Sequence, residues 1–449
     1  TVFWNKEDPV HFDRFLARSS VFDYVFTTDA RCIPKYRAHF GHDRVYALPF
    51  AAQPALHNPV QTEPRTGMVC FAGTYYGSRH DERRRDLAHI LLPAMEYGLD
   101  IYDRQAGIPS NDRDSYSFPE IYQPAIRGRL EYDEMVRAYK RYRVFLNVNS
   151  VKDSPTMFSR RVFELLACGT PVVSSYARGI VELLGDAVFI SESEEDTRRH
   201  LEALLNGGEW ARASLRGIRR VLGEHTYRRR LATVWETIGL RRAELAPPSI
   251  AVLVPLQTGQ DCRPLAAAIR AQTQRPHEVV LLAPDGAPAP SPEWWRAQLP
   301  GIPVRATSTS GDPWQEVIGS SGAHAVAVMD PRDHYGPDYL RDHALALEYA
   351  PNDFVGKQSF RRREGQTRVV SVTPGSEFHP VRSVPAATLV VRRQAFTPEV
   401  LQAVRTGRIF SRPSDDILSI DAFNYVQNAH VAYGSAAPME SRMLALVEA

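Results

Sequence analysis

The chain has 449 residues, too many for one hydrophobic core, and this length predicts two or three domains. Its 43% hydrophobic and 24% charged residues are typical of a globular protein. The 54 basic and 52 acidic residues nearly balance, which argues against a nucleic-acid partner and against an acidic tail.

The four cysteines lie far apart, without a CxxC pair or a histidine at zinc-ligand spacing. This pattern favours buried, unbridged thiols in a reducing compartment. No apolar run approaches the roughly 20 residues that span a bilayer, and no signal peptide opens the chain. These observations predict a cytoplasmic protein. Because the first residues already have strand character, we also expect an upstream segment before Thr1.

The first 65 residues alternate between β-branched runs and helical stripes, as expected of an α/β domain with mostly parallel strands. The pattern predicts strands at 1–4, 23–28 and 44–50, and helices at 11–20 and 32–41. The proline-rich stretch 49–64 interrupts both periods and is predicted to be a linker.

A second α/β domain is predicted at 66–245, with strands at 67–73, 143–150 and 170–175. Arginine greatly outnumbers glutamate in its last part, residues 209–245. That excess indicates either a solvated helix face or a patch that contacts anionic lipid or polymer. After "APP" at 246–248, a third domain at 249–449 restarts the pattern, with strands near 249–256, 277–286 and 323–328.

The stretch 155–168 is predicted to be a helix, with Ser154 as N-cap and Pro155 at its first position. Its buried stripe consists of Phe158, Val162, Leu165 and Leu166, and Gly169 ends it.

Arg160, Arg161 and Glu164 lie off this buried stripe, one helical turn apart. An i, i+4 surface ion pair explains Arg160 and Glu164 without any function. The alternative is a ligand site, because ligands of open α/β sheets lie at strand ends and helix N-termini. Free N–H groups at 154–157 would then bind a diphosphate together with Arg160, and Glu164 would accept hydrogen bonds from ribose hydroxyls.

The segment "FELLACGTPVVSS", after "LNVNSVKDSPTMFSRR", resembles the donor-binding segment of GT-B glycosyltransferases. In that family a Glu before a Gly-x-Pro turn holds the nucleotide ribose, which implies this role for Glu164. With "FWNKEDPVHFDRFL", "FDYVFTTD" and "FAGTYYGSRHDERR", residues 1–240 are similar to bacterial spore-maturation (CgeB-like) glycosyltransferases. The resemblance implies Rossmann-like GT-B units: 66–245 would bind the nucleotide sugar, and 1–65 would be part of the acceptor-side unit.

The resemblance also implies functions for individual positions. Many retaining GT-B enzymes carry a second Glu eight positions before the ribose-binding one, and here that position is Thr156. Glu7, Asp8 and Asp29 follow strands that would face the cleft, so they are candidates for the base or for orienting the acceptor. Helix-capping carboxylates explain them equally well. Gly73 would let the backbone approach phosphate, or is a plain turn glycine.

Residues 249–449 resemble a GT-A glycosyltransferase domain of the family 2 type, through "SIAVLVPL", "VMDPRDHYGPDYL" and "SDDILSIDAFNYV". The resemblance implies that Asp285 binds the nucleobase and that the pair Asp415 and Asp416 supplies the base. Where that family has an Asp-rich metal turn, this chain has Asp330, Pro331, Arg332 and Asp333. Because a guanidinium cannot coordinate Mg²⁺, this domain is predicted to be metal-free, with Arg332 on phosphate, or catalytically silent, which we prefer.

The sequence therefore predicts a glycosyltransferase that uses a nucleotide diphosphate sugar and requires no cofactor in its GT-B half. The predicted acceptor is a polysaccharide, glycolipid, protein or small molecule. Two alternatives stay open: a non-catalytic scaffold in a polysaccharide-synthesising complex, and catalysis by the GT-A-like domain with a divalent cation.

Overall fold

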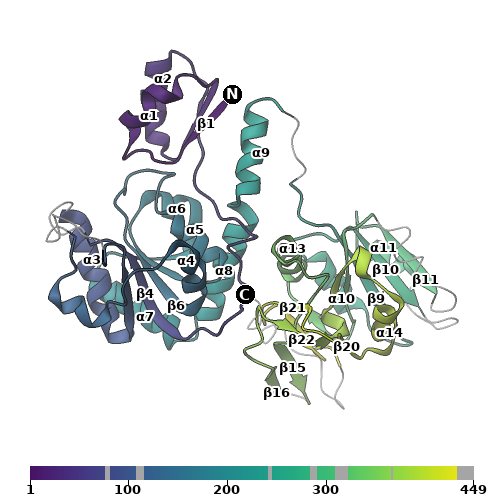
Figure 1. Ribbon diagram of the computed structural model, residues 1–449. Coiled ribbons are helices and arrows are strands. Elements are labelled where there is room, and N and C mark those ends of the chain that lie inside the picture. Colours follow the sequence, from purple (N-terminus) through teal and green to yellow (C-terminus); the bar gives the residue numbers. More distant parts are fainter. Residues whose placement is uncertain are drawn as a thin grey trace. The chain divides into compact units, whose positions relative to one another are not determined.

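The structure is a computed structural model that describes residues 1–75, 81–107, 116–240, 245–283, 291–308, 322–365 and 368–431 (Figure 1). The chain divides into two compact units. Unit 1 comprises Thr1–Pro59 and Glu63–Leu245, and unit 2 comprises Val60–Thr62 and Ala246–Ala449. Both are mixed α/β with parallel, Rossmann-like strands, which confirms the predicted fold class. The predicted domains 1–65 and 66–245 thus lie mostly within one compact unit.

The N-terminal part of unit 1 is a small parallel sheet in the order β1-β2-β3 with two helices. Its elements are β1 (Val2–Asn5), α1 (Phe12–Ser19), β2 (Tyr24–Thr27), α2 (Ile33–Phe40) and β3 (Val45–Ala47). All five match predicted strands and helices. Residues 49–64, all of them described, contain no helix or extended strand, and the segments on both sides of them belong to the same unit.

The rest of unit 1 is a five-stranded parallel sheet in the order β5-β4-β6-β7-β8. The strands are β4 (Gly67–Gly73), β5 (Leu99–Asp103), β6 (Tyr142–Asn147), β7 (Val172–Ser175) and β8 (Val188–Ser191). The helices are α3 (Asp81–Ala94), α4 (Tyr132–Arg141), α5 (Arg160–Ala167), α6 (Arg178–Leu184), α7 (Glu194–Leu205), α8 (Trp210–Glu224) and α9 (Tyr227–Thr237). The chain runs from β4 outward to β5 and then returns to the other side of β4, so strand order reverses between β4 and β6.

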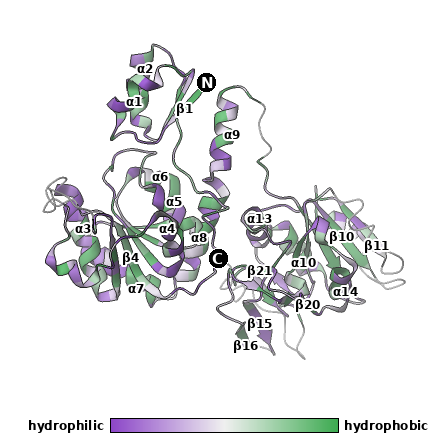
Figure 2. Cartoon of the chain, in the orientation of Figure 1, coloured by the Kyte–Doolittle hydropathy of each residue, from purple (hydrophilic) through white to green (hydrophobic). Residues whose placement is uncertain are grey.

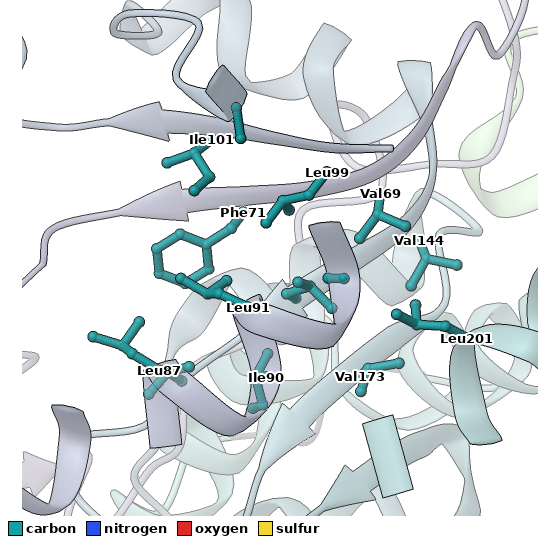
Figure 3. Packing of buried hydrophobic residues seen from close by; sticks show 14 of the residues in the cluster. Val69, Phe71, Leu87, Ile90, Leu91, Leu99, Ile101, Val144, Val173 and Leu201 are labelled. Atoms are coloured by element: carbon teal, nitrogen blue, oxygen red, sulfur yellow. The ribbon is translucent and has the colours of Figure 1, made fainter. Parts of the chain in front are cut away.

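Alternating strand residues pack against helices on the two faces of this sheet. Val69 and Phe71 of β4 share one buried cluster with Val144 of β6 and with Leu87 and Leu91 of α3 (Figure 3). On the other face, Phe145 packs edge-on against Tyr139 of α4, with ring centroids 5.7 Å apart. Burial on both faces explains why these strands are nearly continuous apolar runs, visible as hydrophobic colours in Figure 2.

The predicted helix at 155–168 was wrong at its start, because α5 begins at Arg160. Ser154 does not cap it: the Ser154 hydroxyl donates to Asp29 Oδ1 (2.7 Å) and accepts from the amide of Met157 (3.0 Å). These contacts hold the segment before α5 in a turn. The predicted end is confirmed, since Gly169 adopts a left-handed φ of 69° just after the helix.

Unit 2 contains an eight-stranded mixed sheet in the order β11-β10-β9-β12-β19-β14-β21-β17. Its strands are β9 (Ile250–Pro255), β10 (Glu278–Ala283), β11 (Val304–Ser308), β12 (Ala325–Val328), β14 (Phe354–Gly356), β17 (Pro380–Val381), β19 (Val390–Arg392) and β21 (Ile417–Ser419). β9 to β12 are mutually parallel, whereas β19 runs antiparallel to β12 and β14.

Smaller sheets and four helices complete the described part of unit 2. The strands are β13 (His334–Tyr335), β15 (Phe360–Glu364), β16 (Arg368–Val372), β18 (Ser383–Pro385), β20 (Ile409–Ser411) and β22 (Tyr425–Gln427). The helices are α10 (Arg263–Arg270), α11 (Pro292–Gln298), α13 (Tyr339–Tyr349) and α14 (Pro398–Thr406).

Candidate functional site

The main candidate site is a pocket in unit 1 at the carboxyl ends of β4 and β6. Its volume is about 590 Å³, within the range of roughly 300–1,000 Å³ typical of small-molecule sites. It lies where strand order reverses, which is where open α/β sheets bind their ligands. The polar lining comprises Gly73, Thr74, Arg83, Arg104, Arg129, Glu131, Asn147, Asn149, Ser150, Ser159 and Arg161.

Arginines dominate the charge of this pocket. Arg129 pairs with Glu131, and Arg83 donates to the carbonyl of Val148 (2.7 Å) and to the hydroxyl of Ser150 (3.1 Å). Arg161 lies in the first turn of α5, and its Nη1 donates to the carbonyl of Ala72 at the end of β4. Its Nε is buried and has no hydrogen-bond partner among the described residues. The pocket therefore suits an anionic ligand.

Neutral groups shape the floor of the pocket. Gly73 ends β4, and a Cβ there would lie 2.9 Å from the Phe71 ring, so a side chain does not fit without movement. Asn147 and Asn149 are buried at the end of β6. Asn147 Nδ2 donates to Ser174 Oγ (2.9 Å), and Asn149 Nδ2 donates to the carbonyl of Ser175 (2.8 Å). These bonds across β6 and β7 fix the amides beside the ligand space.

Glu164 lies on α5 next to the pocket but does not line it. Its side chain is 8% exposed, and Oε2 accepts from the Tyr139 hydroxyl at 2.9 Å. Oε1 lies 2.7 Å from Arg160 Nε and 4.0 Å from His57 Nε2. Burial lowers the pKa of His57, which favours the neutral imidazole. Arg160 is 46% exposed, so the pair is an i, i+4 ion pair with one buried and one half-exposed partner.

The three candidate bases lie in different surroundings. Asp8 is buried and accepts from Thr27 Oγ1 (2.6 Å) and Asn5 Nδ2 (2.8 Å), and burial raises its pKa. Asp29 is also buried and accepts from Ser154 Oγ and from the guanidinium of Arg31. Glu7 is exposed. Asp8 and Asp29 thus stabilise local structure, and only the Glu7 carboxylate lies open to solvent among these three.

Thr156 belongs to the turn before α5. Its hydroxyl donates to the carbonyl of Thr28 (2.8 Å) and accepts from the amide of Ala30 (2.9 Å). The position that would carry a second Glu in many GT-B enzymes therefore joins two segments of unit 1.

In unit 2, Asp330 and Arg332 line a smaller pocket of about 250 Å³. The Arg332 guanidinium binds both oxygens of Asp330, through Nε (3.0 Å) and Nη2 (2.7 Å). Asp333 is buried and accepts from the Tyr425 hydroxyl (2.6 Å) and the Asn428 amide (2.8 Å), and burial raises its pKa to about 7. Arg332 thus bonds to both carboxylate oxygens of Asp330. Among the described residues, no cluster of three His, Cys, Asp or Glu side chains could hold a metal ion.

Of the other predicted residues of unit 2 that the structure describes, Asp333, Asp415 and Asp416 do not line this pocket. Asp285 lies outside the described residues. Asp415 and Asp416 precede β21, and they pair with Arg382 (3.1 Å) and Arg412 (3.2 Å). Because β21 runs in the same direction as β12, the start of β21 is at the edge opposite Asp330. The structure therefore does not bring the acidic pair to the turn at 330–333.

Part of the arginine excess at 209–245 has structural partners. Arg219 and Arg230 are buried, and Arg230 donates from Nε to the carbonyl of Pro49 (2.9 Å). In the part of the chain that the structure describes, no helix is both long enough and apolar enough to cross a bilayer.

Sequence reasoning missed Arg83, Arg104, Arg129, Asn147 and Asn149. The two asparagines had a signal, because polar residues directly follow the apolar run of a predicted strand. The arginines come from α3 and from loops, and nothing in their local sequence separates them from surface charges.

A family model matches part of unit 1. Residues 101–236, from β5 into α9, match the family model described as glycosyl transferase-like. No curated protein matches the chain.

Several solved structures are similar to parts of this chain. TarS from S. aureus is 14% identical over 40% of this chain and 61% of its own, with a TM-score of 0.29. Sucrose-phosphate synthase from Thermosynechococcus elongatus is 14% identical over 52% and 64%, with a TM-score of 0.37. A glycosyltransferase from Rickettsia africae is 11% identical over 50% and 66%, with a TM-score of 0.37. This chain thus spans less than two thirds of the length of TarS and of the synthase.

Proposed function

We propose that unit 1 is a glycosyltransferase that binds a nucleotide diphosphate sugar in the pocket at the ends of β4 and β6. The observation that carries this proposal is the group of arginines, Arg83, Arg104 and Arg161, around a pocket of about 590 Å³ at the reversal of strand order. The family-model match at 101–236 covers most of the same sheet and supports sugar transfer as the reaction.

The chemistry follows from the charges of the pocket. When the sugar leaves, negative charge builds up on the diphosphate, and fixed guanidinium groups stabilise that charge in the transition state. Arg161 lines the pocket, and its guanidinium would bind a phosphate oxygen there. Gly73 allows backbone and phosphate to approach closely. We therefore propose that this half needs no metal cofactor.

Glu164 remains our proposed partner for the ribose. Tyr139 holds its Oε2, so Oε1 would accept a ribose hydroxyl once the half-exposed Arg160 turns away. Glu7, whose carboxylate is exposed, is the proposed base or acceptor-orienting group. The acceptor class stays broad: a polysaccharide, a glycolipid, a protein or a small molecule. We also propose the cytoplasm as the compartment, since all four cysteines are free and buried.

Calorimetry with a panel of UDP, GDP and dTDP sugars tests the proposal. The wild type should bind one nucleotide class, and Arg161→Gln should weaken that binding about tenfold or more, as expected when a charge-assisted hydrogen bond is lost. Arg178→Gln is the matched control, because Arg178 pairs with Glu182 on α6 and does not line the pocket. Absence of any nucleotide binding, or equal binding by the wild type and Arg161→Gln, would contradict the proposal.

For unit 2 we propose a GT-A-like domain that is catalytically silent and serves in packing or acceptor binding. The support is the Arg332 guanidinium bound to both oxygens of Asp330. Transfer activity that requires Mn²⁺ and disappears in Asp330→Ala, but survives in Arg161→Gln, would instead assign catalysis to unit 2. If neither unit binds a nucleotide sugar, the scaffold alternative is favoured.

A further inference from the structure

Two segments of unit 1 that are far apart in sequence are joined by a set of side-chain hydrogen bonds. One is the turn at 28–30, directly after β2. The other is the turn at 154–159, directly before α5. Asp29 Oδ1 accepts from Ser154 Oγ at 2.7 Å, and the Thr156 hydroxyl bonds to the Thr28 carbonyl (2.8 Å) and the Ala30 amide (2.9 Å). We call these three bonds the latch.

The bond from Ser154 to Asp29 is buried, and the two bonds of Thr156 are partly buried. Asp29 and Ser154 are fully buried. The Ser154 hydroxyl, which donates to Asp29, also accepts from the amide of Met157 at 3.0 Å. Thr156 uses its hydroxyl as both donor and acceptor. Removal of one of these hydroxyls would leave its hydrogen-bond partner unsatisfied. An unsatisfied buried polar group lowers the stability of the folded protein.

The latch leads directly into the proposed donor pocket. Met157, Phe158 and Ser159, the residues just after Thr156, line that pocket, and Arg161 follows in the first turn of α5. The segment has no regular secondary structure of its own to fix it. Its position therefore depends on bonds made to the turn after β2.

We propose that Thr156 is a positioning residue for nucleotide binding, acting with Asp29 and Ser154 to hold the turn at 154–159 as one wall of the pocket. This role rests on the proposed function of unit 1. It differs from a base function for Asp29 and from a sugar contact for Thr156, since both side chains are bonded to protein groups. The latch sets the location of Ser159 and Arg161, and these touch the ligand.

Thr156→Val tests this role, because it keeps the shape of the side chain and removes the hydroxyl. The conservative variant Thr156→Ser retains the hydroxyl. Thr233→Val is the matched control, because it makes the same change at an exposed position on α9. There the Thr233 hydroxyl donates to the Arg229 carbonyl of its own helix (3.1 Å). Two quantities are measured on the full chain: the Kd for the nucleoside diphosphate that the wild type binds, and the hydrogen-exchange rate of the Ala30 amide.

In Thr156→Val we expect faster exchange at Ala30 and a Kd raised roughly three- to tenfold, as for the loss of one neutral hydrogen bond. Thr156→Ser should restore both, and Thr233→Val should change neither. Faster exchange with an unchanged Kd would overturn the positioning role and leave a merely structural bond. If the wild type binds no nucleoside diphosphate, the proposed function itself fails, and this role fails with it.

Discussion

The change Glu164→Gln separates a ribose-binding glutamate from a structural one. Glutamine has the same size and can still accept the Tyr139 hydroxyl, which lies 2.9 Å from Oε2 in the wild type. What the substitution removes is the negative charge opposite Arg160 Nε, 2.7 Å away. The variant should therefore fold normally.

The expected size of each effect follows from exposure. Because Arg160 is 46% exposed, its pair with Glu164 is close to a surface pair, and its loss should cost less than about 1 kcal/mol of unfolding free energy. A hydrogen bond from a ribose hydroxyl to a buried carboxylate contributes about 1.5–3 kcal/mol, which is about ten- to hundredfold in affinity. If Glu164 binds ribose, the substitution should cost more binding free energy than unfolding free energy.

Calorimetry with the preferred nucleoside diphosphate and its 2′- and 3′-deoxy analogues measures this contribution directly. The wild type should prefer the ribonucleotide to one of the deoxy analogues about tenfold or more, and Glu164→Gln should abolish that preference. Glu182→Gln is the matched control, since Glu182 forms an i, i+4 pair with Arg178 at 2.6 Å on α6. An identical preference in the wild type and Glu164→Gln would refute the ribose role and leave Glu164 as a structural ion pair.

Three further predictions concern stability. Burial raises the pKa of Asp333 to about 7. The contribution of the protonated carboxyl to the free energy of unfolding is therefore complete below its ordinary pKa of about 3.9 and is lost as pH rises toward 7. Thermal unfolding should therefore show an advantage of Asp333→Asn over the wild type that grows between about pH 4 and 7 and is level above that range, and a constant difference from pH 4 to 7 would contradict this. Burial lowers the pKa of His225 to about 4, so stability present above its ordinary pKa of about 6.5 is lost as pH falls toward 4. His225→Gln should reduce that loss, as measured by denaturant unfolding at pH 7 and 4.5, and an unchanged loss would count against it. At Gly169, with φ 69°, a Cβ would lie 2.9 Å from Ser214 Oγ, so Gly169→Ala should lose about 1–3 kcal/mol more than Gly41→Ala, where φ is 70° but nothing lies within 4 Å. Equal losses in denaturant unfolding would show that backbone strain alone accounts for both.

The fold was predictable where burial leaves a clear sequence pattern. Strands such as β4, β6 and β9 are buried on both faces, and their sequences are largely continuous apolar runs. The start of α5 was not predictable, because Ser154 and Pro155 are good helix-start residues whose local preference is overridden by the bond from Ser154 to Asp29. That partner is 125 residues away in sequence, beyond the reach of any local rule.

The candidate site was predictable only in part, for a similar reason. Gly73 and Arg161 line the pocket and were found from strand-end and helix-start patterns. Arg83 lies in the first turn of α3, one turn before the buried Leu87, and its immediate sequence neighbours are charged. Only the arrangement of α3 beside the end of β6 turns it toward the carbonyl of Val148, and that is a property of the tertiary fold.

In unit 2, whether an acidic residue precedes or follows its strand decides at which edge of the sheet it lies, and motif spacing does not. β12, β14 and β21 run in one direction, so residues after them share one edge of the sheet. Asp330 and Asp421 follow their strands, whereas Asp415 and Asp416 precede β21. Asp421 Oδ1 is bonded to Nζ of the fully buried Lys357 at 3.0 Å, as Asp330 is bonded to Arg332. Two carboxylates at this edge are thus neutralised by cations of the chain itself, which favours a silent unit 2 over a metal-dependent one.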